Sequence, residues 1–273
     1  VALFSLGLNL LVLASPLYMM QVYDRVLASA HLDTLFVVSL MLVVSFMAYA
    51  CLEAARSLAV LQVGVWLDRR LLADSLSASV ASALGAGGQA AQGVRDLSTL
   101  RGFVAGGGLV PYFDLPWLPI FLTAVFLIHP VLGWVGVGGA LLLAGLAYAN
   151  ESSTRQPLQE AGKESIRSLL EADAAMRNAE AIAAMGMLPA LVATWRRNAE
   201  RVLAPQTLAG TRAGWYSAIA KTLRVALQSA ILGVGAYLTL KHETTGGAMI
   251  AASIIVGRAL APMEQAIGGW RNM

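Results

Sequence analysis

The feature that most constrains the fold of this chain is a set of long runs without Asp, Glu, Lys or Arg. A helix needs about 20 predominantly apolar residues to cross the core of a bilayer. The run at 115–150 is too long for one crossing, and His129-Pro130 in its middle is a natural turn, so this run predicts two spans. Together, the runs predict six spans, at roughly 1–23, 34–57, 110–129, 131–151, 220–240 and 245–267.

The composition indicates a membrane protein rather than a soluble one. Hydrophobic residues make up 58% of the 273 residues and charged residues only 13%, about half of the roughly 25% that is usual in soluble domains. The single cysteine, Cys51, allows no disulfide within the chain. His31, His129 and His242 each stand alone in a predicted loop, without metal-ligand spacing. The sequence therefore predicts an all-α membrane protein with no metal or cofactor site of its own.

The connections between the predicted spans are uneven in length and charge. The three short ones hold only Arg25 and Lys241, whereas the two long ones, at 58–109 and 152–219, hold most of the 19 basic residues. Because loops rich in Lys and Arg stay on the cytoplasmic side, the long connections and the N-terminus are predicted to be cytoplasmic.

The long connections are predicted to be helical extensions of the spans. Apolar residues in 188–203 recur with the i, i+3, i+4, i+7 spacing of an amphipathic helix. Charges of both signs are interspersed over 151–201, as on a solvated helix face. Gly186 and Pro189 predict a break in the second connection. We therefore expect two long helical hairpins that continue from the spans into the cytoplasm.

Several stretches resemble signatures of one family. Residues 15–27, SPLYMMQVYDRVL, resemble the first-helix signature of type I secretion ABC transporters. Residues 95–103, 114–121 and 129–133 resemble the third-helix region of that family, and residues 247–267 resemble its sixth helix. The subgroup that the chain resembles most is the PrtD-like permease/ATPases, which export proteases, lipases, adhesins and related proteins.

This resemblance implies a fold and a function. The fold is an ABC exporter domain of six transmembrane helices with long helices extending into the cytoplasm, in a homodimer in the inner membrane of a Gram-negative bacterium. The implied partners are membrane lipid, a periplasmic adaptor, an outer-membrane channel and the secreted protein, with no nucleic acid. The implied function is export of unfolded polypeptide, such as a protease, lipase, adhesin or RTX-like protein, driven by ATP and Mg in a nucleotide-binding domain.

The chain itself contains no Walker A loop. That loop requires G-x-x-x-x-G-K-[ST], but Lys163 is followed by Glu164, and Pro157 stands where the first glycine is needed. We therefore expect residues 1–273 to be the transmembrane domain alone, without the nucleotide-binding domain and without a catalytic residue, although the full-length protein would be an ABC-type ATPase. Two alternatives stay open: an ABC exporter of lipid, drug or peptide, and a non-transporting membrane scaffold.

Charged residues within the predicted spans are candidate pathway residues, because polar groups in a bilayer are costly and often functional. Arg258 would lie about 18 Å into the sixth span, where it either faces the central pathway or forms a buried ion pair with another helix. Lys221 and Arg224 lie near the inner end of the fifth span and either extend to the interface or guide the substrate. Glu53 and Arg56 have the i, i+3 spacing of an ion pair on one helix face.

Prolines mark candidate hinges. Those inside the first and third spans are either elbows for alternating access or fixed kinks needed for packing. They are Pro16, Pro111, Pro116 and Pro119. Asp114 beside them is a candidate helix cap.

The resemblance also implies contacts to the nucleotide-binding domain. In the family, short coupling helices at the cytoplasmic turns make these contacts, and here they would lie near 88–96 and 177–187. The candidate polar contacts are Arg95, Asp96, Arg177, Asn178 and Glu180. The alternative is that these residues form ordinary solvated turns.

Overall fold

The structure of the chain is a computed structural model that describes residues 1–86, 101, 102, 104, 106, 108 and 110–269. The secondary structure of these residues is entirely helical, with no strand among them, which confirms the predicted all-α fold. The chain divides into two compact units. The first, called here the membrane unit, comprises Val1–Val63, Phe103–Ala147 and Ser217–Met273. The second, called here the extension unit, comprises Gly64–Gly102 and Tyr148–Tyr216.

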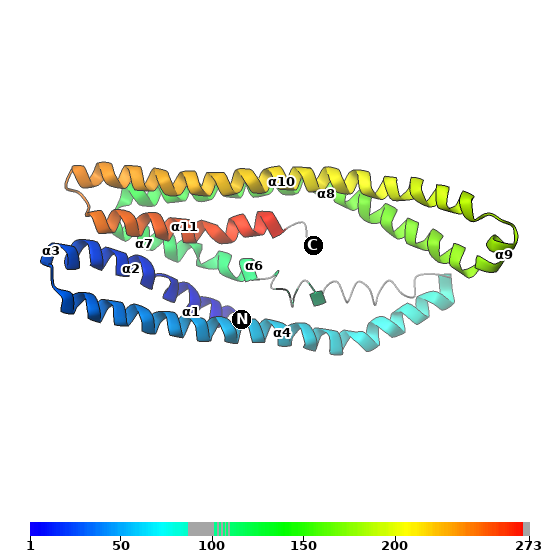
Figure 1. Ribbon diagram of the computed structural model, residues 1–273, viewed down its shortest axis with the longest axis horizontal. Coiled ribbons are helices and arrows are strands. Elements are labelled where there is room, and N and C mark those ends of the chain that lie inside the picture. The colour runs from blue at the N-terminus through cyan, green and yellow to red at the C-terminus, as the bar shows by residue number, and fades with distance from the viewer. Residues whose placement is uncertain (87–100, 103, 105, 107, 109, 270–273) are drawn as a thin grey trace. The chain divides into compact units, whose positions relative to one another are not determined.

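The N-terminal part of the membrane unit is an interrupted helix followed by a continuous one (Figure 1). Its elements are α1 (Ala2–Val12), α2 (Ala14–Gln21), the π-helix η1 (Val22–Val26), α3 (Leu27–Ser29) and the first part of α4 (Leu32–Ala86). The interrupted helix lies beside α4, where the hydroxyl groups of Tyr18 and Ser39 are hydrogen-bonded at 3.1 Å.

The remaining elements of the membrane unit follow from Val110 onward. They are α6 (Val110–Asp114), the 3₁₀ helix η2 (Leu115–Trp117), α7 (Leu118–Ile128), the first part of α8 (Pro130–Arg177), the last part of α10 (Leu188–Leu240) and α11 (Gly246–Gly269). The turns after α3, α7 and α10 are short and lie at one end of this unit, called here the short-connection end (Figure 1).

Six helices or helix series are long and apolar enough to cross a bilayer, as the sequence predicted. They are Ala2–Ser29, Leu32–Ser75, Val110–Ile128, Pro130–Arg177, Leu188–Leu240 and Gly246–Gly268. The chain is therefore a multi-pass membrane protein. Helical structure in the first of them continues to Ser29 rather than ending near Tyr23. Asp24 in this added part accepts hydrogen bonds from Thr245 and from Gly247 at the start of α11.

Not every proline interrupts its helix. The first span is interrupted at Leu13, three residues before Pro16, whose ring removes the N–H that would bond to Val12. The third span is broken into α6, η2 and α7 around Pro111, Pro116 and Pro119. By contrast, the prolines inside α8, α10 and α11 leave those helices continuous.

The core of the membrane unit is built around α11. This helix packs against α2 and α7, and its buried face includes Ala252, Ile255, Val256, Ala259 and Leu260. Small residues let neighbouring helices approach closely in a membrane. A Cβ atom on Gly235 of α10, for example, would lie 2.6 Å from Cγ of Met249 on α11.

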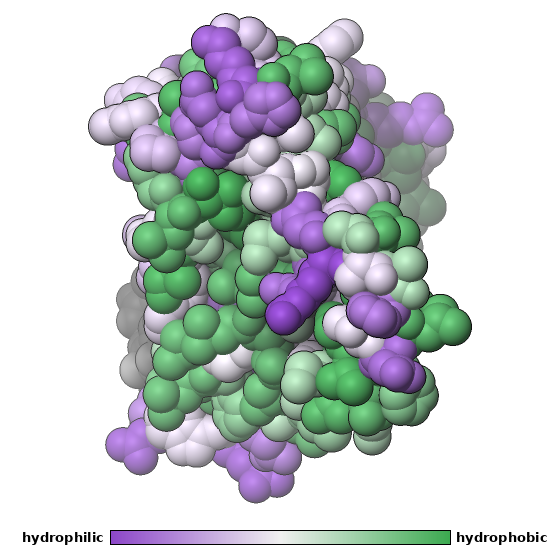
Figure 2. All heavy atoms as spheres, turned by 90° about the vertical axis from the view of Figure 1, so that its left-hand side faces the viewer, coloured by the Kyte–Doolittle hydropathy of each residue, from purple (hydrophilic) through white to green (hydrophobic). Residues whose placement is uncertain are grey.

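The apolar stretch of α4 has the opposite environment. No part of its most apolar window is buried within the chain. Large side chains such as Phe36, Met41, Val44 and Met47 are exposed on it. Lipid is the natural environment for such an exposed apolar helix. Figure 2 views the chain from the short-connection end, where both hydrophilic and hydrophobic side chains lie on the surface.

In the extension unit, long helices continue beyond the length that a bilayer requires. At 1.5 Å per residue, the 48 residues of α8 span about 72 Å, more than twice a bilayer core of about 30 Å. Between α8 and α10 lies the short helix α9 (Ala179–Ala184). Gly186 follows it with φ of +66°, a left-handed conformation that favours glycine. This confirms the break predicted there.

Candidate functional site

A cluster of buried polar side chains lies in the membrane unit, centred on Arg56 of α4. The guanidinium donates to both carboxylate oxygens of Glu53 at 2.8 and 2.9 Å, which confirms the predicted i, i+3 pair. It also donates to both oxygens of Asp114, at 3.3 Å each. The side chain of Arg56 is only 10% exposed, and that of Asp114 is 18% exposed. One guanidinium therefore joins the second span to the start of the third.

The first span contributes neutral hydrogen-bonding groups to the same cluster. The amide nitrogen of Asn9 donates to Oδ1 of Asp114 at 3.1 Å and to the carbonyl of Ser5 at 2.8 Å. The hydroxyl of Ser5, which is fully buried, lies 3.5 Å from Arg56 Nη1. Buried charges are tolerated when they are paired and hydrogen-bonded. This arrangement meets that condition.

Asp114 does not have the predicted role of a helix cap. Although it precedes η2, its carboxylate makes no capping hydrogen bond. The carboxylate accepts instead from Arg56 and Asn9. Arg–carboxylate pairs are charge-assisted and often bidentate, and Asp114 is bonded to the Arg56 guanidinium through both of its oxygens.

A cavity of about 180 Å³ adjoins this cluster. Its polar lining residues are Asn9, Tyr49, Arg56, Asp114, Arg258 and Gln265. The cluster of one guanidinium and two carboxylates carries a net negative charge when ionised, and Arg258 brings the opposite charge to the same cavity. Arg258 is exposed, although its neighbours Gly257 and Ala259 are buried, and it makes no hydrogen bond or ion pair with any residue that the structure describes.

The other two candidate pathway residues differ from each other. Arg224 of α10 is ion-paired with Glu264 of α11, and both side chains are largely buried, at 23% and 20% exposure. Lys221, one helical turn earlier, is exposed and has no partner within the described part of the chain. Arg224 thus joins two spans, whereas Lys221 and Arg258 are available to other groups.

At the short-connection end, Asp24 links the first and sixth spans. Its carboxylate accepts a hydrogen bond from the Thr245 hydroxyl at 2.5 Å and from the Gly247 N–H at 2.8 Å. His129 and Glu243 approach to 3.4 Å at the same end. No spacing in the sequence predicts these long-range pairs. A carboxylate at the end of an apolar run is the one signal that could have pointed toward Asp24.

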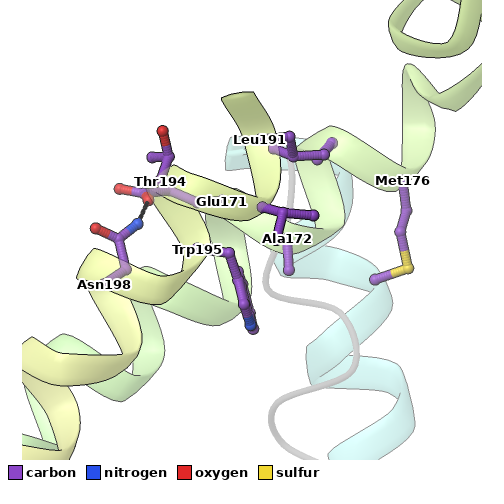
Figure 3. A pocket seen from close by; sticks show the side chains of 9 residues that line it. Glu171, Ala172, Met176, Leu191, Thr194, Trp195 and Asn198 are labelled. Carbon is purple, nitrogen blue, oxygen red and sulfur yellow. Dashed lines mark hydrogen bonds between the residues drawn. The ribbon is translucent and has the colours of Figure 1, made fainter. Parts of the chain in front are cut away.

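A second candidate surface lies in the extension unit, where α8 and α10 form a groove with a volume of about 230 Å³ (Figure 3). It is lined mainly by apolar side chains such as Met176, Leu191 and Trp195. A hydrogen bond from Asn198 to Glu171 joins the two helices at its edge. An exposed apolar groove beside polar residues is typical of a surface that contacts another protein.

Three of the predicted contacts to a nucleotide-binding domain lie close to this groove in sequence. Arg177 ends α8, Asn178 occupies the break before α9, and Glu180 is in the first turn of α9. All three are exposed, and Asn178 donates to the carbonyl of Ala174 at 2.8 Å. Arg95 and Asp96, which were predicted for the first long connection, lie outside the described residues.

Comparison with known proteins identifies relatives along the whole chain. The type I secretion system ATP-binding protein PrsD of Rhizobium meliloti strain 1021 is 35% identical over 275 residues, which cover 100% of this chain and 47% of PrsD. The toxin RTX-I translocation ATP-binding protein of Actinobacillus pleuropneumoniae is 25% identical over 98% of this chain and 39% of its own length. The alpha-hemolysin translocation ATP-binding protein HlyB of Escherichia coli O157:H7 is 24% identical with the same coverage. No family model matches the chain.

These relatives are secretion or toxin-translocation ATP-binding proteins by name. The chain is homologous over its whole length to type I secretion ABC proteins, and it matches their transmembrane part. The homology confirms the resemblance inferred from the motifs. The chain spans less than half the length of each of these three relatives.

Proposed function

We propose that this chain is the membrane-spanning part of an ATP-driven type I secretion transporter that exports unfolded polypeptide. The observation that carries the proposal is that the whole of this chain is homologous to 47% of PrsD, a type I secretion protein. The fold supports it, because six candidate spans continue into helices about 72–82 Å long, such as α8 and α4. Such helices can carry a movement from a soluble domain into the membrane.

The polar cavity supplies a candidate segment of the export pathway. An unpaired arginine facing lipid near the middle of a span is strongly unfavourable, so the exposed Arg258 is proposed to face a water-filled path or a second copy of the chain. The lining combines six polar side chains with apolar ones such as Leu8 and Phe121, so the cavity offers both kinds of group to a passing polypeptide. Lys221 is proposed to guide the substrate, while Arg224 holds α10 to α11 through Glu264.

The turn around α9 is the proposed contact for the nucleotide-binding domain. ATP and Mg would bind in that domain, and its movement would act on Arg177, Asn178 and Glu180, and through them on α8 and α10. Arg95 and Asp96 are proposed to do the same for the first long connection. Pro16, Pro111, Pro116 and Pro119 are proposed as the places where the spans bend in response.

The proposed assembly follows from the same homology. It is a homodimer in the bacterial inner membrane, with the N-terminus and the long connections in the cytoplasm. A periplasmic adaptor and an outer-membrane channel would complete the path to the exterior. The positive charge of the long connections supports this orientation.

ATPase measurements on the full-length protein in lipid nanodiscs test this function. We expect an unfolded polypeptide encoded by a neighbouring gene to stimulate hydrolysis, and Arg258→Ala to abolish that stimulation while leaving basal hydrolysis intact. Arg155→Ala, which removes an exposed arginine of α8 in the extension unit, is the matched control and should be stimulated normally.

Other outcomes assign the protein to another class. Stimulation by lipid or amphipathic drug alone would indicate the other kind of ABC exporter. No hydrolysis under any condition would indicate a scaffold. Normal stimulation of Arg258→Ala would remove Arg258 from the pathway without contradicting polypeptide export.

A further inference from the structure

The carboxylate of Asp24 caps a helix that lies more than 200 residues away in sequence. Its Oδ1 atom accepts from the N–H of Gly247, in the first turn of α11, at 2.8 Å. Its Oδ2 atom accepts from the hydroxyl of Thr245 at 2.5 Å. The same hydroxyl oxygen accepts from the N–H of Ala248 at 3.2 Å. Two otherwise free N–H groups of α11 are thus satisfied by one carboxylate and one hydroxyl.

The site accepts few other side chains. A Cβ atom on Gly247 would lie 2.7 Å from Cγ and Oδ1 of Asp24 and 2.7 Å from the carbonyl oxygen of Met20. Contacts that short do not occur, so a larger residue would separate α11 from the first span. The negative charge of Asp24 also lies at the positive end of the α11 dipole, where it is favoured.

Asp24 belongs to η1, a π-helical segment. Single π-helical turns are rare and concentrate at functional sites. The sequence around Asp24 and the sequence that begins at Gly247 are also two of the stretches that carry the family resemblance. The structure brings these two stretches into direct contact, which gives a physical reason for an acidic residue in one and a glycine in the other.

The contact is one that water can break. Thr245 is exposed and Asp24 is half-buried, whereas Gly247 is buried. When α11 moves away, water can hydrate the carboxylate and the freed N–H groups, so separation does not leave buried groups unsatisfied. The Arg56–Asp114 pair lacks this property, because its two side chains are only 10% and 18% exposed.

We propose that Asp24, Thr245 and Gly247 form a capping clamp that holds the first and sixth spans together at the short-connection end, and that the clamp opens each time the pathway opens at that end. This proposal rests on the proposed function, because the opening it describes belongs to the transport cycle. Asp24 acts as a positioning residue: it sets the place of α11, which carries Arg258 and Glu264.

Cysteine accessibility in the full-length protein tests the clamp. Ala251 is 1% exposed and lies one helical turn from Gly247, so a cysteine there reports separation of α11 from its neighbours. In a Cys51→Ala background, Ala251→Cys is labelled in intact cells with a membrane-impermeant maleimide, with and without depletion of ATP. In this parent protein, which keeps Asp24, we expect the rate of labelling to differ between cells with ATP and cells depleted of it.

Breaking the clamp should remove that dependence. We expect Asp24→Ala to label about tenfold faster in ATP-depleted cells, the factor expected for loss of one charge-assisted hydrogen bond. Asp24→Asn keeps an acceptor for Gly247 and should show a smaller increase. Asp33→Asn, which alters another acidic residue near the same end, in the first turn of α4, should behave as the parent. Asp24→Asn and Thr245→Val are nearly isosteric, so they carry the test if Asp24→Ala does not fold.

The outcomes separate the clamp from the proposed function. Equal labelling rates in the parent, Asp24→Asn and Thr245→Val, with any ATP dependence retained, would overturn the clamp. Reduced protein yield with an unchanged ratio of rates with and without ATP would likewise overturn it, because Asp24 would then be purely structural. Labelling only after permeabilisation would contradict the proposed orientation in the membrane. The clamp would still be supported if, in permeabilised cells, Asp24→Ala were labelled fastest, Asp24→Asn more slowly and the parent slowest.

Discussion

The membrane unit and the extension unit share three helices but differ in how deeply the arginines of their ion pairs are buried. In the membrane unit, Arg56 and Arg224 each pair with a carboxylate on a different helix, and their side chains are 10% and 23% exposed. In the extension unit, Arg167 pairs with Glu171 on the same helix, and these side chains are 65% and 44% exposed. The pairs Arg56–Asp114 and Arg224–Glu264 therefore join helices, whereas the Arg167–Glu171 pair lies on the surface of one helix.

Glycine shows the same difference. In the membrane unit, Gly139 of α8 and Gly235 of α10 allow a neighbouring helix to approach closely. In the extension unit, a Cβ atom on Gly162 or Gly210 of the same helices would meet nothing within 4 Å. Close packing at a glycine is therefore found at some positions of the membrane unit, although Gly138 and Gly233 of the same helices also meet nothing within 4 Å.

The largest expected effect comes from breaking the buried cluster. Replacing Arg56 with Met leaves the Asp114 and Glu53 carboxylates without their cation, and the loss of one partner of a buried pair costs about 3–5 kcal/mol. The free energy of unfolding in detergent measures this. The combined variant Glu53→Gln, Arg56→Met, Asp114→Leu removes the charges together and should recover most of the loss. A single variant as stable as the parent, or a combined variant no better than the single one, would contradict this account.

Much of the fold followed from the sequence because hydrophobicity and breaks are local. The uncharged runs predicted six spans, and Gly186 marked the break before α10. A break in the first span was expected from Pro16 and lies at Leu13. The π-helix at Asp24 was not predicted, because it depends on what a distant helix offers to the backbone. Proline alone was not a sufficient signal, since Pro157 lies inside a continuous α8.

The candidate site was only partly predictable for the same reason. The Glu53–Arg56 pair follows from i, i+3 spacing on one helix. The approach of Asp114 to Arg56 and of Glu264 to Arg224 depends on how separate helices pack, which no local spacing encodes. Asp114 shows the consequence: its position beside the prolines of the third span predicted a cap, but its carboxylate accepts from Arg56 and Asn9 instead.

Replacing two glycines of α10 with alanine should change the stability by smaller amounts, and the two changes should have opposite signs. In the membrane unit, Gly235→Ala places a Cβ atom 2.6 Å from Cγ and 3.2 Å from Cβ of Met249, atoms close to the backbone of α11. Such overpacking should cost about 1–3 kcal/mol. In the extension unit, Gly210→Ala meets nothing and should stabilise the helix by about 0.5–1 kcal/mol.

Thermal unfolding midpoints of the two variants, measured side by side in the same detergent, provide the comparison. A rise for Gly210→Ala and a fall for Gly235→Ala would sharpen the distinction between the units. The same sign for both would show that packing along α10 is uniform.

The smallest effect is expected at Arg167. An exposed i, i+4 pair contributes about 0.3–0.5 kcal/mol, and Arg before Glu is the weaker order along a helix. Alanine also has a slightly higher helix propensity than arginine, so Arg167→Ala should change the free energy of unfolding by less than about 0.5 kcal/mol. High salt should remove even that difference, because exposed charges are screened. A loss above about 1 kcal/mol that persists in salt would mean that this surface is covered in the full-length protein. Glu171 lines the groove between α8 and α10. Such a result would therefore indicate that a protein partner covers this groove and that the groove is not exposed to water.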